Sequence, residues 1–295
     1  MRSRRGFALP ELVVAMALFL IVSGAAFSLL NHTQRVARAQ AERVDLQGNL
    51  RAGALIIPAE LRALGYDSVP GLPAAGSDIL AMGPDSIMIR AVRASGIVCH
   101  LTAANSVTID TSTSRSYAAS RMPVSGGRDQ LMLFFELDPA TPADDRWVSG
   151  RPITSVGPGT CAAAYGSRPG LQLGTSLGST GYPDSLTIGS PFRTYETVVY
   201  RLYRSGSGYY LGARSASAGE AAPQPMLGPL TPNGFRLEYY DSTGVVPAAR
   251  PADVRSIQVT LIAQSDQRVA GTGAGSQAVT TDSVVTRVAL RNALR

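Results

Sequence analysis

The sequence contains no lysine, because all 27 of its basic residues are arginine. A P-loop, a Schiff-base enzyme and a serine–lysine dyad each require the primary amine or compact ammonium of lysine. The absence therefore excludes all three classes. Any step of this protein's function that uses ATP must be carried out by a partner.

Histidine and cysteine are also scarce, with two of each, at His32, His100, Cys99 and Cys161. Two cysteines cannot form a zinc site alone, and the histidines do not add a plausible ligand spacing. The acidic run at positions 138–145 does not match a calcium loop either, and a solvated turn explains it better. We therefore expect no metal and no cofactor.

One segment, Gly174 to Gly178, has the Gly-x-Ser-x-Gly form of a nucleophile elbow. An elbow lies between a strand and a helix, and its acid and histidine follow the serine in the chain. Here the flanking residues are typical of loops, and both histidines precede Ser176. We therefore expect a flexible loop at this position and a protein that is not an enzyme.

The formal net charge is +6, but three of the arginines lie within the first six residues. Without those three, 24 basic residues face 21 acidic ones. A nucleic-acid surface needs arginines gathered on one face, whereas here they are scattered, the closest set being Arg201, Arg204 and Arg214. Solvated strand faces explain these more simply, so nucleic acid is not an expected partner.

Residues 7–30 form an apolar stretch with a single charge, Glu11, and follow a short basic leader, residues 1–6. A stretch of this length spans a bilayer as a helix, and the arginines of the leader hold its first end in the cytoplasm. A secretory signal is cut after its apolar region, but the sharp change here lies before it, between Gly6 and Phe7. An ordinary single-pass anchor with a chance glutamate is the alternative.

The run Arg-Gly-Phe-Ala-Leu-Pro-Glu-Leu at positions 5–12 resembles the processing site of type IV prepilins and of type II secretion pseudopilins. The resemblance implies that a prepilin peptidase cleaves between Gly6 and Phe7 and methylates the new amine of Phe7. It makes Glu11 the fifth mature residue. Pro10 departs from the family pattern at little cost, because the first helical N–H groups have no intrahelical acceptor.

The same resemblance implies a location and a set of partners. The precursor would be a single-pass protein of the inner (cytoplasmic) membrane with its C-terminal domain outside the cytoplasm, and the mature form would enter a pilus or pseudopilus. The partners would be prepilin peptidase, other major and minor pilins, and an inner-membrane assembly platform with a separate assembly ATPase.

A carboxylate such as Glu11 costs about 2.5–3.5 kcal/mol in the hydrocarbon region, so it needs a cation. Once Gly6 is removed, the nearest is the amine of Phe7, on the same helix or on a neighbouring subunit. At about 4 Å and an effective dielectric near 20, the pair gains about 4 kcal/mol before its own desolvation. We therefore predict that this pairing fixes the axial register between subunits.

Cys99 and Cys161 follow the membrane segment and thus lie on the extracytoplasmic side, where disulfides are permitted. We predict that they are bonded to each other. Two separate buried thiols remain the alternative, because connectivity cannot be proved from sequence.

The helical pattern continues beyond the membrane segment, from residue 31 to residue 64, with apolar residues on one face at positions 46, 50, 57, 61 and 64. We predict one long rod, with a kink or a new turn at Pro58. Gly65 supplies the stop.

Residues 65–295 are predicted to form a β-rich domain with long loops near 157–191 and 265–282, where Gly, Ser, Thr and Pro are concentrated. Strand patterns occur at 86–92, 97–102, 106–111, 130–137, 195–203, 209–214, 235–240, 255–263 and 283–291. The expected fold is α+β, with a long N-terminal helix packed on an antiparallel β-rich C-terminal domain.

Three downstream segments, 59–66, 235–241 and 286–292, look like the PilW-type minor pilins and, less closely, the J pseudopilin of type II secretion. This resemblance implies a subunit that primes, assembles or caps a type IV pilus and has no active site. The alternatives are a type II secretion pseudopilin, or a membrane-tethered adhesion or DNA-binding module that uses a pilin anchor.

Overall fold

The computed structural model describes residues 9–64, 78–103, 105–112, 118–119, 124–136, 138, 140–141, 145–175, 186–244, 248, 250–270 and 277–290. The chain divides into two compact units. The first contains Met1–Gly48 and Gln264–Asp282, and the second contains Asn49–Ala263 and Ser283–Arg295.

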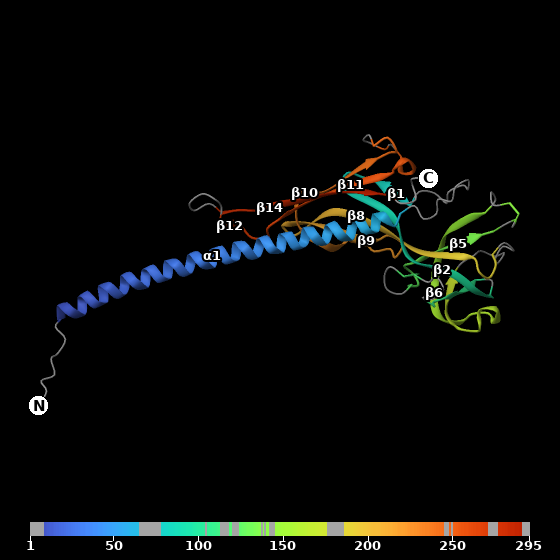
Figure 1. Cartoon of the computed structure of the whole chain (residues 1–295), viewed down its shortest axis with the longest axis horizontal. Helices are drawn as coiled ribbons and strands as arrows, with labels where there is room; N and C mark the ends of the chain where they lie inside the picture. Colours follow the sequence, from blue (N-terminus) through green and yellow to red (C-terminus); the bar gives the residue numbers. More distant parts are fainter. Residues whose placement is uncertain are drawn as a thin grey trace, which may run out of the picture. The chain divides into compact units, whose positions relative to one another are not determined.

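The N-terminal helix α1 is continuous from Leu9 to Arg62 (Figure 1). It passes through Pro58, so the new turn that the sequence predicts there is not present. The missing N–H of Pro58 removes one hydrogen bond near the end of the helix, where Ile57 and Leu61 are each only 1 % exposed. Burial of these two side chains on either side of the proline holds the last turns in place.

Fourteen strands are found in the described residues, in the order β1 Ile79–Met82, β2 Ser86–Ala103, β3 Ser106–Asp110, β4 Ala118–Ala119, β5 Gln130–Phe135, β6 Arg146–Thr160, β7 Pro169–Thr175, β8 Pro191–Ser205, β9 Gly208–Ser215, β10 Gln224–Tyr240, β11 Ser256–Gln264, β12 Val269–Ala270, β13 Gln277–Ala278 and β14 Thr281–Ala289. Short 3-10 turns lie at Ala163–Tyr165 and Pro251–Asp253. The predicted α+β fold is confirmed: a long helix packs on an antiparallel β-rich domain.

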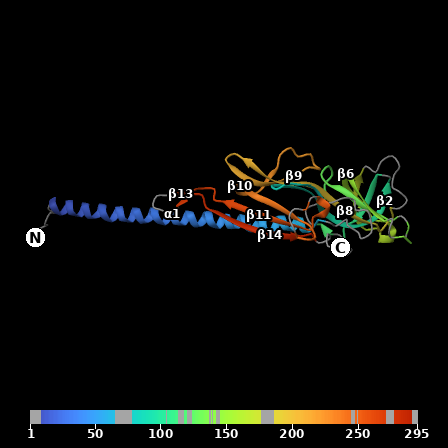
Figure 2. The same ribbon diagram turned by 90° about the horizontal axis from the view of Figure 1, so that it is seen from above.

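The second unit contains an open sheet in the order β1-β2-β8-β9-β10-β11-β14, and Figure 2 shows β9, β10 and β11 in this order. The last part of α1 packs on β10 and β11. A Cβ atom added at Gly53 would lie 2.6 Å from Leu227 Cδ2 and 2.6 Å from Leu261 Cδ1. Glycine at this helix position therefore lets the helix backbone approach the sheet closely.

The same unit also contains a closed barrel. β2 pairs with β3, β3 with β7, β7 with β6, β6 with β5, β5 with β8, and β8 returns to β2, all antiparallel. Six strands thus form a ring with no free edge inside it. Its buried core includes Val98, Val107, Ile109, Leu131, Leu133, Ile153, Leu173 and Phe192. The long strands β2 and β8 belong to both the barrel and the open sheet.

The predicted loop at 157–191 is wrong over residues 157–160 and 169–175, which form the end of β6 and all of β7. The glycines there serve close packing between strands. A Cβ atom at Gly170 would lie 2.6 Å from the carbonyl oxygen of Ile109, and one at Gly159 would lie 2.8 Å from Thr108 Cγ2. Residues 176–185, which include Ser176, lie outside the described part of the chain.

The predicted loop at 265–282 contains a two-stranded hairpin, β12 with β13, and the first residues of β14. Ser265 N donates to the carbonyl oxygen of Thr280 at 2.8 Å, which closes the base of this hairpin within the first unit. The prediction is therefore wrong for the strand residues. The glycine-rich positions 271–276 lie outside the described residues.

Candidate functional site: an exposed apolar helix and its buried anchor

The first half of α1 exposes an apolar surface. Its large apolar side chains between Leu9 and Leu30 are 53–78 % exposed. By length and composition the helix is able to cross a membrane, and none of its apolar window is buried. A surface of this size in water would be strongly unfavourable, so it is suited to a bilayer or to a bundle of similar helices.

Glu11 lies in the first turn of this helix and its side chain is exposed. Pro10 also lies in that first turn, as the sequence analysis expects. Gly6 and Phe7, between which cleavage is predicted, lie outside the described residues. The structure therefore places one of the three predicted processing and assembly residues, on an otherwise apolar surface.

The polar part of the helix begins soon after Leu30. The hydroxyl of Thr33 donates to the carbonyl oxygens of Leu29, at 3.1 Å, and Leu30, at 2.9 Å. This local bond satisfies the hydroxyl inside the helix, so Thr33 is compatible with the border of an apolar medium. Further along, Glu42 Oε2 accepts a hydrogen bond of 3.2 Å from the backbone N–H of Asp266, within the first unit.

The end of α1 is fastened to the second unit by polar contacts as well as by packing. Asn49 Nδ2 donates to the carbonyl oxygen of Gly228 at 3.2 Å. Glu60, in the last turns of the helix, has its Oε2 atom 3.3 Å from Arg93 Nη1 on β2. Two polar contacts, about three helical turns apart, therefore hold the helix on the sheet, and Gly53 packs against the sheet between them.

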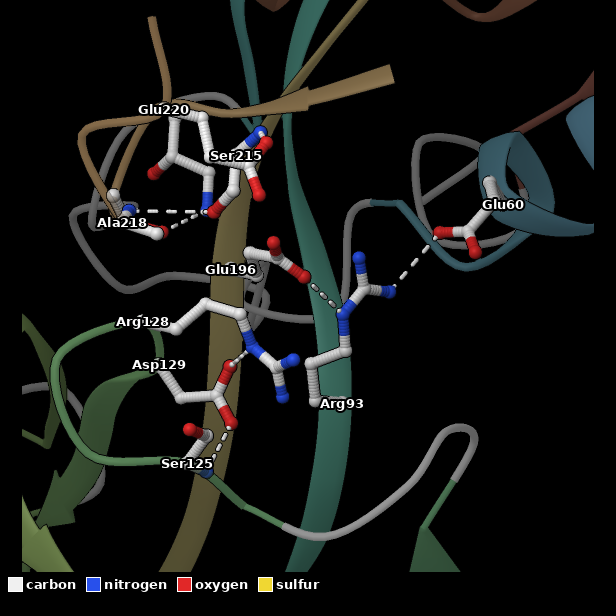
Figure 3. A network of polar contacts seen from close by, with 11 residues as sticks. Glu60, Arg93, Ser125, Arg128, Asp129, Glu196, Ser215, Ala218 and Glu220 are labelled. Carbon is white, nitrogen blue, oxygen red and sulfur yellow. Dashed lines mark hydrogen bonds and ion pairs between the residues drawn. The ribbon is translucent and has the colours of Figure 1, made fainter. Parts of the chain in front are cut away.

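Arg93 is the centre of a buried ion cluster, shown in Figure 3. It occupies an irregularity in the pairing of β2 with β8, between Val92 and Ala94. Its Nε donates to Glu196 Oε2 at 2.9 Å, and its side chain is 3 % exposed. The cluster thus joins α1, β2 and β8 at the place where the open sheet and the barrel share their strands.

A second ion pair lies beside this cluster in Figure 3, between Arg128 and Asp129. Arg128 Nε donates to Asp129 Oδ1 at 3.1 Å, and the Asp129 side chain is fully buried. The other oxygen of Asp129 accepts from the backbone N–H of Ser125 at 2.8 Å. Asp129 therefore orders the turn that leads into β5.

The electrostatic environment keeps both arginines charged. Burial lowers the pKa of the Arg93 guanidinium, but attraction from Glu60 and from Glu196 outweighs burial, so the pKa is raised above its usual value. The hydrogen bond to Asp129 raises the pKa of Arg128, with further attraction from Glu196. A buried charge with its partners satisfied is tolerated, whereas loss of one partner is costly.

The predicted disulfide is present, and it closes one end of the barrel. Cys99 on β2 is bonded to Cys161, which directly follows β6, across 62 residues of sequence. Ala162 N donates to the carbonyl oxygen of Cys99 at 3.0 Å, and His100 Nδ1 lies 3.1 Å from the carbonyl oxygen of Thr160. In the chain-entropy model a bridge of this span contributes about 4 kcal/mol. His100 is thus part of this closure.

The residues of the ion cluster were not predicted from the sequence, although the sequence contains a signal for them. On β2, Ile87, Ile89 and Ala91 are buried, and Arg93 continues the same alternation. On β8, Glu196 lies between the buried positions 194 and 198. A charge at an inward position of a strand indicates a buried partner, here one of opposite sign.

Comparison with known proteins adds one finding to this geometry. Residues 1–27 match the model of the prokaryotic N-terminal methylation motif. This motif is typical of type IV pilin and pseudopilin precursors, and it implies processing by prepilin peptidase. The motif together with the apolar helix fits a membrane-anchored precursor. Neither the curated proteins nor the solved structures contain a match to this chain.

Proposed function

We propose that the mature chain is a minor pilin, a structural subunit without catalytic activity that primes, assembles or caps a type IV pilus. Cleavage between Gly6 and Phe7 leaves the apolar helix on the protein, and Phe7 becomes the methylated amino terminus. The assembly platform and its separate ATPase supply the driving force, because a chain without lysine has no P-loop.

One observation supports this role most directly. The helix keeps an apolar surface exposed from Leu9 to Leu30, while its other end is fastened to the sheet through Asn49, Gly53 and Glu60. The exposed N-terminal part of the helix is suited to packing with helices of other subunits. The C-terminal part of the helix is held on the β domain. Glu11 pairs with the amine of Phe7 of a neighbouring subunit when the helices assemble.

The β domain is larger than a simple anchor requires. The closed barrel, with its disulfide and its Arg93 cluster, supplies a rigid surface for lateral contacts with other pilins. The length of the chain and its middle segment suit the PilW-type minor pilins better than a compact pseudopilin.

The test is the composition of isolated filaments. Under this proposal, pili contain substoichiometric amounts of this chain, and its deletion reduces the number of filaments. The same amounts in secretion pseudopili, with loss of secretion on deletion, would identify a pseudopilin instead. A chain found only as a monomer of the inner membrane would favour a tethered adhesion or DNA-binding module and contradict the proposal.

A further inference from the structure

Four charged residues of α1 lie on one face of the helix just beyond the apolar half. Arg35, Arg38, Glu42 and Asp45 follow one another at spacings of three, four and three residues, which places them on one stripe. The stripe has two positive charges towards the N-terminus and two negative charges after them. We call it the charge stripe.

The side chains of the charge stripe are available for an outside partner. Arg35, Arg38 and Asp45 are exposed, and none of the three has an ion pair within the residues that the structure describes. Glu42 is half-buried and uses one carboxylate oxygen, Oε2, for the N–H of Asp266. A carboxylate has several acceptor sites, so a second bond is compatible with this contact.

The order of the charges is not the one that best stabilises a single helix. Arg35 and Arg38 are a like-charge pair three residues apart, and so are Glu42 and Asp45. Such neighbours destabilise an isolated helix, and only Arg38 with Glu42 has a favourable spacing. The segregated pattern is instead complementary to a shifted copy of itself.

We propose that the charge stripe sets the axial register between two copies of this chain packed as parallel helices. This inference rests on the proposed function, since insertion in one membrane makes the helices parallel. A shift of seven residues, about 10.5 Å along the axis, places Arg35 opposite Glu42 and Arg38 opposite Asp45. Without a shift, like charges face each other, and shifts of four or ten residues each form only one pair.

The same shift agrees with the predicted pairing at the amino terminus. When one copy is shifted by seven residues along the other, its Phe7 is level with position 14 of the second copy, counted along the sequence. Position 14 is three residues from Glu11. That is about 4.5 Å along a helix axis, within reach of a glutamate side chain. The pairing at the amino terminus is therefore compatible with a shift of seven residues, and the charge stripe is what selects that shift.

The occupant of this face is a second copy of the chain, because both halves of the complementary pattern are present on one sequence. Phospholipid phosphates could attract the basic half, Arg35 and Arg38, but they do not explain the acidic half. A different pilin with a similar stripe is the other source of the same pairing. Cross-linking of charge variants separates these cases.

The register is measured by cross-linking two differently tagged full-length copies in the same membrane. One copy carries Gln34→Cys and the other Ala41→Cys, both exposed positions that precede a stripe residue by four. The shift of seven brings these thiols together, and a short bismaleimide then joins them. A pair in which both copies carry Gln34→Cys is the matched control for zero shift, and it should give a much lower yield.

The charges are then changed at Arg38 and Asp45, which have no ion partner among the described residues. Arg38→Asp or Asp45→Arg in both copies should each lower the cross-linking yield about twofold to fivefold, the size expected for one exposed ion pair. The double swap Arg38→Asp with Asp45→Arg should restore it. An unchanged unfolding midpoint, followed by the fluorescence of Trp147, shows that each variant is folded.

Three results would overturn the inference: equal yields at shifts of zero and seven, no recovery in the double swap, or an effect of Arg38→Asp without one of Asp45→Arg. The last would assign the basic half to lipid phosphate or to a different pilin. Failure of the proposed function is seen separately, as the absence of this chain from isolated pili, because the cross-linking reports register in the membrane whether or not filaments form.

Discussion

Arg93 Nε donates a hydrogen bond of 2.9 Å to Glu196 Oε2, between side chains that are 3 % and 11 % exposed. With Glu60 of α1 on its other side, Arg93 connects the helix to both strands that the open sheet and the barrel share. The register of the helix against the domain therefore depends on a cluster in which each charge has a partner.

The first prediction concerns this cluster. Arg93→Met leaves the buried carboxylate of Glu196 and the partly buried one of Glu60 without their cation, and should lower the free energy of unfolding by about 3–5 kcal/mol. Urea unfolding of the full chain in detergent, followed by fluorescence of the single tryptophan, Trp147, measures the loss. Arg146→Met, at an exposed position, is the control and should change stability by less than about 0.5 kcal/mol. Equal stability of the two variants would show that the cluster is not structural.

The second prediction concerns the glycines of the barrel. Gly170→Ala places a methyl group 2.6 Å from the carbonyl oxygen of Ile109 and should cost about 1–3 kcal/mol, because backbone must move. Gly157→Ala is the matched control on β6, since no atom lies within 4 Å of its new Cβ. Thermal unfolding of both variants should separate them, and a stable Gly170→Ala protein would argue against the close pairing of β7 with β3.

The third prediction concerns the buried hydroxyl of Tyr239 and the stability of the protein at high pH, where no lysine titrates. The hydroxyl of Tyr239 donates to the carbonyl oxygens of Gly83, at 3.0 Å, and Ser86, at 3.3 Å, and burial raises its pKa. Since the folded state then holds this proton longer than the unfolded state, the contribution of Tyr239 is complete below the unfolded pKa of about 10 and is lost as pH rises through the folded pKa.

Stability should accordingly fall above about pH 10, and the fall should be shallower in Tyr239→Phe, by up to about 1.4 kcal/mol per pH unit. With no lysine and no free cysteine among the described residues, tyrosines dominate this range. Unfolding free energies of both proteins measured from pH 8 upwards test the prediction. Identical slopes would mean that Tyr239 ionises equally in the folded and unfolded chains.

The fourth prediction concerns Glu11. Glu11→Gln keeps the size of the side chain but removes its charge, so the register set with the amine of Phe7 is lost. The variant should reach the membrane at the normal level but enter filaments less efficiently than the unmodified chain. Quantitative immunoblots of membranes and of sheared filaments measure both. Equal incorporation would leave Glu11 without the role assigned to it.

The sequence was sufficient for the elements whose pattern is regular. The alternation of apolar residues identified β5, β8 and β11, the two halves of β2 as separate strands, and the last six residues of β10. The helix face that contains Ile57 and Leu61 is buried as predicted. The end of β6 and all of β7 were not predicted, because glycines such as Gly159 and Gly170 are typical of loops in sequence. In the structure these glycines allow strands to lie close together. Strand order and ring closure depend on contacts between distant segments, which periodicity does not contain.

Part of the candidate site was also predicted from the sequence, and part was found only in the structure. The motif around Glu11 is local in sequence and was recognised without a structure, and residues 1–27 match the methylation motif. Glu60, Arg93 and Glu196 come from three elements, and their proximity follows from the pairing of β2 with β8 and the docking of α1. The sequence signal for this cluster was that Arg93 and Glu196 occupy positions of their strands at which the side chain points into the protein.

The central claim is that the apolar helix stays on the mature protein and begins with a new amine. Mass spectrometry of the amino-terminal peptide of the protein isolated from its native membrane tests this directly. The account predicts a peptide that begins with N-methylated Phe7 and lacks residues 1–6. An intact leader on functional protein, or an amino terminus beyond residue 30, would contradict it.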